Sequence, residues 1–135
     1  MTEDESNKRF NQIADAGDLL MHTYYDASSL AGWWCDLQTG QRLEMTQERV
    51  GDKLMLVVTE LAEAKEGHRK NKKDDHLPHR PMIEVELADA LIRICDLAGA
   101  LNLDLGGAIA EKLAYNALRA DHKIENRLAL NGKKT

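Results

Sequence analysis

Residues 82–101 read MIEVELADALIRICDLAGAL, a stretch that is apolar over a wide stripe. Leucine, alanine and isoleucine dominate it, and no glycine or proline interrupts it before Gly99. A stripe this wide is typical of an α-helix that is buried on more than one side. The stretch therefore predicts a long helix that is buried on more than one side.

The flanking sequence extends the helical pattern in both directions. Residues 50–64 are again apolar over a broad face, and Thr46 before them is a candidate N-cap. Residues 67–80 hold almost no apolar side chain and predict a solvated loop. Residues 5–26 carry apolar side chains on one helical face, and Asp104 is a candidate cap for a last helix.

These patterns predict an all-α fold, a helical bundle of about four main helices. No segment shows the two-residue alternation of a β-strand. Residues 27–45 are less periodic and are expected to form a loop or a short helix. The apolar faces are too broad for one small bundle, so we expect oligomerisation to complete it.

The 135 residues predict a single domain with a formal net charge of −5. This charge argues against a stable nucleic-acid partner, because such proteins neutralise phosphates with Lys and Arg. No apolar run is long enough to span a membrane, and the acidic N-terminus is unlike a signal peptide. With only Cys35 and Cys95 as thiols, we expect a cytoplasmic protein.

Two pairs of acidic residues lie inside the apolar runs. Glu60 and Glu63 are three residues apart in one predicted helix, and Glu86 and Asp89 are three apart in the next. Residues at this spacing are neighbours on a helix surface, and buried anions are costly unless they are paired or bound to metal. An ordinary solvated acidic face is the alternative, but the apolar context favours a Mg²⁺ site.

Three segments together resemble the MazG-like all-α nucleoside triphosphate pyrophosphohydrolases. TELAEA (59–64) and EVELADALIR (84–93) are similar to the family's EExxE and ExxD motifs, although Thr59 stands where the first acid is often found. EKLAYNALR (111–119) resembles the following helix, in which a Lys, an Asn and an Arg recur. The resemblance covers the catalytic helices, residues 45–125. Residues 1–44, with the N-terminal helix and the tryptophans, match less clearly, and residues 126–135 are a tail.

The resemblance implies an enzyme that hydrolyses a nucleoside or deoxynucleoside triphosphate to the monophosphate and pyrophosphate. It implies Mg²⁺ as cofactor, a role in cleansing the nucleotide pool, and a homo-oligomer, either a dimer or a dimer of dimers. A base-specific dUTP or dCTP hydrolase of the same superfamily is one alternative. A non-catalytic helical oligomerisation or adaptor module, with solvated acidic pairs, is another.

The resemblance and, for the two tryptophans, the residue type alone give the expected site residues. Glu63 is a candidate base as well as a ligand, and the phosphates would meet Lys112 and Arg119. Asn116 could recognise the base or sugar, and Trp33 or Trp34 could stack on the base or serve only in packing. The expected metal ligands are Glu60, Glu63, Glu86 and Asp89, and the expected substrate-binding residues are Trp33, Trp34, Lys112, Asn116 and Arg119.

Overall fold

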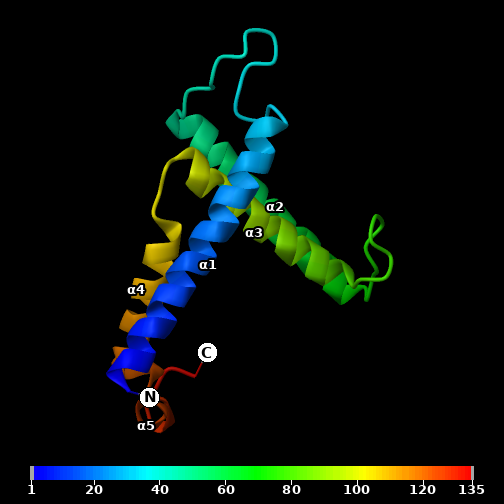
Figure 1. The fold of residues 1–135 in the computed structure, drawn as a ribbon. Coiled ribbons are helices and arrows are strands. Elements are labelled where there is room, and N and C mark those ends of the chain that lie inside the picture. Colours follow the sequence, from blue (N-terminus) through cyan, green and yellow to red (C-terminus); the bar gives the residue numbers. More distant parts are fainter. Residues whose placement is uncertain (1, 135) are drawn as a thin grey trace. The chain divides into compact units, whose positions relative to one another are not determined.

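The computed structural model describes residues 2–134, and this part of the chain contains five α-helices (Figure 1). Within those residues there is no strand, only isolated bridges between Cys35 and Arg42 and between Lys73 and Pro81. The all-α prediction with four main helices is confirmed, and a short fifth helix follows them. The helices are α1 (Glu3–Leu30), α2 (Gln47–Arg69), α3 (Met82–Ala100), α4 (Leu105–Leu118) and α5 (Ile124–Leu128), with a 3₁₀ turn at Ala120–His122.

The helices are distributed over two compact units. The central unit comprises residues 19–103, and the terminal unit comprises residues 2–18 and 104–134 of the described chain. Helix α1 contributes its first part to the terminal unit and its second part to the central unit. All four predicted metal ligands lie in the central unit.

Side-chain caps start two of the helices as the sequence predicts. The Thr46 side chain accepts a hydrogen bond from the amide of Arg49 at the start of α2. The Asp104 side chain accepts one from the amide of Gly107 at the start of α4. Each cap satisfies a backbone donor that has no partner within the helix, which explains why these helices begin where they do.

Three helices end in the same backbone motif. Gly32, Asn71 and Asn102 follow α1, α2 and α3 with φ angles of 82°, 51° and 53°. In each case the next amide donates to the carbonyl oxygen five residues earlier, which is the Schellman arrangement. Glycine and asparagine adopt this left-handed conformation most readily, so these residues set where the helices stop.

The tryptophan segment is anchored to α3. Helix α1 runs on to Leu30, farther than the sequence predicts, and Ser28 donates to Asp96 Oδ2 at 2.9 Å. The Trp34 indole N–H donates to Asp96 Oδ1 at 2.7 Å, and Arg42 Nη2 donates to the carbonyl of Ala100, the last residue of α3. The contacts of Trp34 and Arg42 hold the segment between α1 and α2 against α3.

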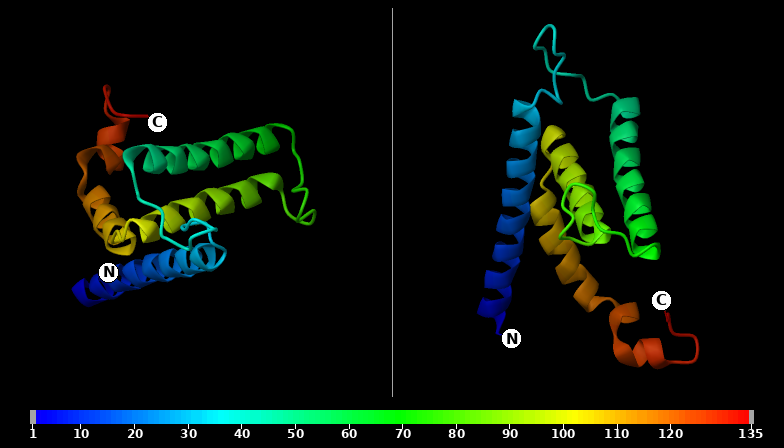
Figure 2. Two further views of the ribbon diagram at one scale, coloured as in Figure 1. Left: turned by 90° about the horizontal axis from the view of Figure 1, so that it is seen from above. Right: turned by 90° about the vertical axis from the view of Figure 1, so that its right-hand side faces the viewer.

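Helices α2 and α3 form an antiparallel hairpin (Figure 2). Helix α2 extends to Arg69, so the loop that joins the two helices begins later than the predicted start at residue 67. Its residues are mostly exposed, as predicted, except Asp74, which is 8% exposed. Asp74 Oδ2 accepts hydrogen bonds from the amides of His76 and Leu77, so this buried carboxylate holds the turn together.

The terminal unit contains a close approach of two helices. A Cβ atom on Gly17 of α1 would lie 2.6 Å from the Cα of Gly106 on α4. The two backbones therefore meet at a point where only glycine fits.

In the described part of the chain, no helix combines the length and apolar character that a membrane crossing requires.

Candidate functional site

Three carboxylates converge in the α2–α3 hairpin. Glu60, Glu63 and Glu86 each offer an oxygen atom, and these atoms all lie within 4.8 Å of one another. Glu60 and Glu86 are 7% and 8% exposed, whereas Glu63 is exposed. The hairpin therefore gathers acids from two helices into one cluster, which we call the carboxylate triad.

Helical periodicity explains why the acids face inward. The buried positions of α2 are Val57, Glu60, Ala64 and Gly67, which follow one another at steps of three and four. Glu86 is likewise followed by Ala90 along the buried stripe of α3. Each buried glutamate thus takes a place in a stripe that is otherwise apolar or small. This arrangement agrees with the expectation that these acids do not belong to a solvated face.

One arginine neutralises part of the triad. Arg93 Nε, on α3, donates to Glu60 Oε1 at 2.5 Å and joins the two helices. The Glu60 side chain is only 10% exposed, but that of Arg93 is 41% exposed. The single positive charge leaves a strong excess of negative charge around the triad.

This crowding changes the acidity of Glu86. Burial, a hydrogen bond with Glu60 and the negative charges of Glu63, Glu60 and Asp89 together raise the pKa of Glu86 from its ordinary value of 4.5 to about 7. Burial is the largest of these causes. Near neutral pH the triad therefore holds a proton in a position where a cation would also relieve the repulsion.

Asp89, the fourth predicted ligand, stands outside the triad. It lies three residues after Glu86 on α3 and is half-buried. Burial raises its pKa, the charge of Glu60 acts in the same direction, and the charge of Arg93 opposes them. Asp89 is thus electrostatically coupled to the triad, although the compact cluster of oxygen atoms contains only the three glutamates.

An open cavity of about 560 Å³ adjoins the triad. Asp89 and Arg93 line it, so it shares two residues with the surroundings of the carboxylates. We call it the α1–α3 cavity, because most of its wall comes from the second part of α1 and from α3. Its lining residues are Tyr24, Ala27, Ser28, Ala31, Trp33, Asp89, Ile92, Arg93 and Asp96.

The two tryptophans have different surroundings. Trp33 is 68% exposed and lines the α1–α3 cavity, where its ring is accessible to a ligand. Trp34 is 3% exposed and packs with Leu97 in the core, while Lys53 Nζ lies 4.7 Å from the centre of its ring. A ring covered in this way has no open face for a nucleobase, so the expectation of stacking by Trp34 is corrected to packing.

The predicted phosphate and sugar contacts lie in the terminal unit. Lys112 Nζ lies 4.7 Å from the centre of the Tyr115 ring, and the Asn116 Oδ1 atom is buried without a hydrogen-bond partner in the described chain. Arg119 pairs with Asp121 through two hydrogen bonds of 2.9 and 2.6 Å. Because α4 ends at Leu118, Arg119 has extended backbone and does not share the helical face of Lys112 and Asn116.

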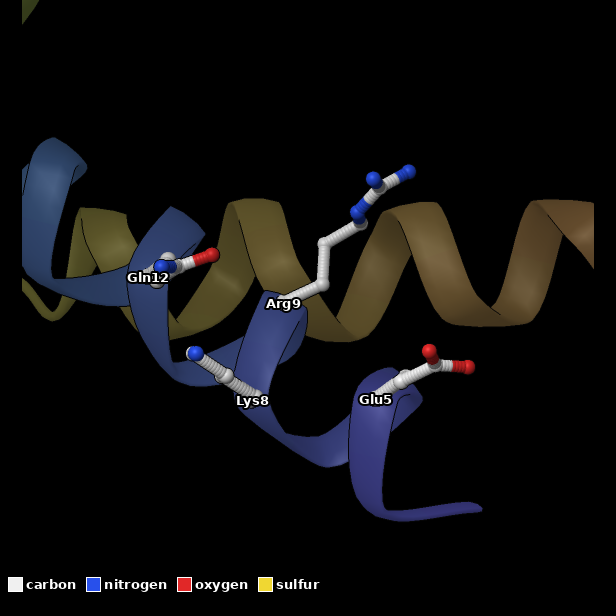
Figure 3. Close-up of a pocket in the computed structure, with 4 residues that line it drawn as sticks. All are labelled: Glu5, Lys8, Arg9 and Gln12. Carbon is white, nitrogen blue, oxygen red and sulfur yellow. The ribbon is translucent and has the colours of Figure 1, made fainter. Parts of the chain in front are cut away.

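A second hollow, of about 360 Å³, lies on the first turns of α1 (Figure 3). Its lining residues are Glu5, Lys8, Arg9 and Gln12. Figure 3 shows the Arg9 side chain leaving the helix away from that of Lys8, so the two cations do not converge on one point. This hollow therefore lacks the convergent groups of the carboxylate triad.

Arg93, Asp74 and Asp96 are not among the site residues predicted from the sequence. Arg93 and Asp96 follow Asp89 at steps of four and seven, which places all three along one side of α3. That periodicity could have marked them as neighbours of the site. Asp74 carries no such signal, because its burial depends on how the loop folds.

Comparison of the chain with protein-family models, with curated proteins and with solved structures finds no match in any of the three.

Proposed function

We propose that this chain is a Mg²⁺-dependent nucleoside triphosphate pyrophosphohydrolase that cleanses the cytoplasmic nucleotide pool. The observation that supports the proposal is the carboxylate triad, whose oxygen atoms lie within 4.8 Å of one another on two helices. Two of these carboxylates, Glu60 and Glu86, are buried, and a divalent cation would relieve the repulsion among the three. Their positions agree with those implied by the sequence resemblance.

The donor set fits magnesium. Mg²⁺ prefers oxygen ligands, and carboxylates are among the oxygen ligands that proteins offer it. The triad supplies three such carboxylates whose oxygen atoms lie within 4.8 Å of one another. Glu60, Glu63 and Glu86 would hold the ion, and Asp89 is the further proposed ligand. When bound, the ion supplies positive charge to the triphosphate and the leaving pyrophosphate.

The protein's own residues would then direct a water molecule to the α-phosphorus. Glu63 is the exposed member of the triad and is the proposed base that takes the proton of this water. A bond forms between the water oxygen and the α-phosphorus, and the bond from that phosphorus to the bridging oxygen breaks. Pyrophosphate leaves with the bridging oxygen and its electron pair, and Glu63 releases its proton to solvent.

The α1–α3 cavity is the proposed site for the nucleoside. Trp33 offers an exposed ring on which a base can stack, and Asp89 links the cavity to the triad. The resemblance implies Lys112, Asn116 and Arg119 as contacts for the phosphates and the sugar or base, and these assignments stay predictions. The shape of the cavity would decide whether the enzyme accepts many bases or only dUTP or dCTP.

We further propose that a second copy of the chain covers the apolar faces of α2 and α3. Exposed patches of this kind on a small protein commonly mark an interface. Light scattering should give at least twice the monomer mass of 15.2 kDa, and a stable monomer with full activity would contradict the proposal. The exposed apolar side chains are Leu54, Met55, Leu56, Val58, Leu61, Leu87, Leu91, Ile92 and Ile94.

A rate panel over the common ribonucleoside and deoxynucleoside triphosphates with Mg²⁺ tests the proposed reaction. Phosphorus NMR, with no added pyrophosphatase, should show a nucleoside monophosphate and intact pyrophosphate. A dominant orthophosphate signal together with a nucleoside diphosphate would contradict attack at the α-phosphorus. The panel also separates a broad enzyme from one restricted to dUTP or dCTP.

The exposed apolar faces also favour a second candidate, a helical adaptor without catalysis. Such a module needs the apolar surface but not the carboxylate triad. Isothermal titration with Mg²⁺ and a non-hydrolysable nucleotide separates the two candidates. Metal-dependent nucleotide binding supports the hydrolase, and its absence supports the adaptor.

A further inference from the structure

We propose that Arg93 is a substrate-binding residue, which contacts the phosphate group next to the nucleoside while its Nε atom holds Glu60. This inference rests on the proposed function and adds to it a residue that neither the motifs nor the comparisons assign. Arg93 pairs with a member of the carboxylate triad and also lines the α1–α3 cavity.

The guanidinium group of Arg93 faces both places. Its Nε atom donates to Glu60 Oε1 at 2.5 Å, and the same side chain lines the cavity. Arginine carries five N–H donors in a planar fork, so the bond with Glu60 uses only part of its capacity. The side chain is 41% exposed, which leaves it accessible from the cavity. Arg93 can therefore bind Glu60 and an anion at the same time.

The order of residues along α3 indicates which phosphate Arg93 would meet. Glu86 belongs to the triad, Arg93 lies seven residues later, and Asp96 lines the cavity beyond it. With a helical rise of about 1.5 Å per residue, Arg93 stands roughly 10 Å along the helix from Glu86. A nucleoside in the cavity would extend its phosphates towards the triad, so the first phosphate would pass Arg93.

The charges in the cavity favour the same assignment. Among the lining residues in the described chain, Arg93 is the one cation, whereas Asp89 and Asp96 are acids. Asp96 already accepts hydrogen bonds from Ser28 and Trp34. A phosphate oxygen entering the cavity would be repelled by the acids and attracted by Arg93.

A purely structural role for Arg93 makes a different prediction. If Arg93 only positions Glu60, its loss should disturb the triad and weaken the binding of metal ions and nucleotides together. If Arg93 also binds phosphate, its loss should weaken the binding of a phosphate group. It should leave the affinity for a metal ion alone unchanged or increased, because a competing positive charge has been removed.

The test compares Arg93→Gln and Arg93→Lys with a matched control, Arg80→Gln. Arg80 also pairs with a glutamate, Glu84, at 3.2 Å, but on an exposed surface. Isothermal titration without metal would measure the affinity for a deoxynucleoside and for its 5′-monophosphate. The base would be the one hydrolysed fastest in the rate panel. Titration with Mn²⁺ alone would measure the metal affinity of each variant.

In the wild type and in Arg80→Gln, the 5′-phosphate should increase affinity about tenfold or more, as expected for a charge-assisted hydrogen bond. Arg93→Gln should lose most of that increase and bind the deoxynucleoside within about twofold of the wild type. Its Mn²⁺ affinity should equal or exceed that of the wild type. Arg93→Lys should keep part of the increase, because lysine retains the charge but not the planar fork.

Two results would overturn the inference while leaving the proposed function intact. One is an active wild type in which Arg93→Gln keeps the full effect of the 5′-phosphate. The other is a parallel loss of Mn²⁺ and deoxynucleoside affinity in both Arg93 variants, which indicates that Arg93 only positions Glu60. A wild type that hydrolyses no nucleotide and binds no Mn²⁺ would overturn the proposed function and this inference together.

Discussion

Two acidic regions of the α2–α3 hairpin hold the same residue type in opposite surroundings. Glu66, near the end of α2, has a side chain that is 45% exposed and pairs with Arg69 at 2.9 Å and Lys70 at 2.6 Å. Hydrogen bonds from these two cations lower its pKa to about 2. Glu86 lies in the carboxylate triad, where burial and neighbouring acids raise its pKa to about 7.

The difference shows that spacing alone does not define a site. Glu60, Glu63 and Glu66 follow one another at intervals of three along α2, so Glu63 pairs equally well with either neighbour in the sequence. Glu60 is buried and faces another acid from α3, whereas Glu66 meets cations from its own helix end. Cations three and four residues away in the sequence neutralise Glu66, whereas the tertiary fold places Glu60 beside another acid as well as beside Arg93.

The largest effect should come from removing an acid from one region but not from the other. Glu60→Gln or Glu86→Gln should lower pyrophosphate release with Mg²⁺ at least about 100-fold, since even the indirect partners of metal ligands are worth 10- to 100-fold. Glu66→Gln should stay within about twofold of the wild type, because its ion pairs are exposed. Circular dichroism should show unchanged helix content in all three variants.

Equal losses in Glu66→Gln and Glu86→Gln would contradict the distinction between the regions.

Asp89→Asn extends the comparison, because Asp89 is half-buried and outside the triad. We expect it to abolish pyrophosphate release if it is a ligand. Near-full turnover in Asp89→Asn would remove it from the ligand set.

The next largest effect concerns stability and pH in the metal-free protein. The folded state holds the Glu86 proton with a pKa of about 7, against an ordinary value of 4.5. Between these values the folded state binds more protons than the unfolded state, so stability should fall as the pH rises. The loss should be at most about 3 kcal/mol for this group, measured by chemical denaturation from pH 4.5 to pH 8.

The control for this pH effect is Glu86→Gln, which should flatten that part of the curve. The pH dependence of folding stability that comes from Glu66 has the opposite sign, because the pKa of Glu66 is lowered. Its contribution to stability is lost only as the pH falls towards 2. The raised pKa of Asp89 adds to the effect of Glu86. A wild-type stability that rises from pH 5 to pH 8 without metal would contradict the assignment.

A smaller effect should accompany metal binding. If a divalent cation displaces the proton held by Glu86, binding at pH 7 should release about half a proton per ion. Titration calorimetry in two buffers with different ionisation enthalpies measures this release. Glu86→Gln should release none, and a wild type that also releases none would show that the cation binds elsewhere.

The smallest expected effect is a change in folding stability from the backbone conformation of the residue after α2, near Glu66. Asn71 ends α2 with a φ angle of 51°, a conformation that glycine adopts more easily. Asn71→Gly should stabilise the protein by up to roughly 1 kcal/mol and leave both acidic regions and the catalytic rate unchanged. A denaturation midpoint below that of the wild type would show that the asparagine side chain contributes more than its backbone costs.

The local features of the fold could be predicted from the sequence because they depend on nearby residues. Thr46 and Asp104 are caps that act on amides three residues away, and both predictions are confirmed. Helical spacing likewise predicted that Glu60 and Glu86 would be buried. The roles of the acids in metal binding, and of Glu63 as a base, stay predictions.

Features that depend on distant contacts could not be predicted in this way. Trp33 and Trp34 are adjacent in sequence, yet only Trp34 reaches Asp96, 62 residues away. The pairing of Arg93 with Glu60 crosses between helices over 33 residues. Arg119 was expected to continue a helical face, but α4 stops before it and Asp121 binds its side chain.

Because the two tryptophans differ in exposure, their fluorescence can report separately on ligand binding and on unfolding. Trp33 and Trp34 are the two tryptophans of the sequence, one in water at the cavity and one inside the core. A Trp34→Phe variant would emit from Trp33 alone, so a stacked base should quench its fluorescence directly. A Trp33→Phe variant would emit from the buried indole, and its spectrum should follow unfolding without responding to ligand.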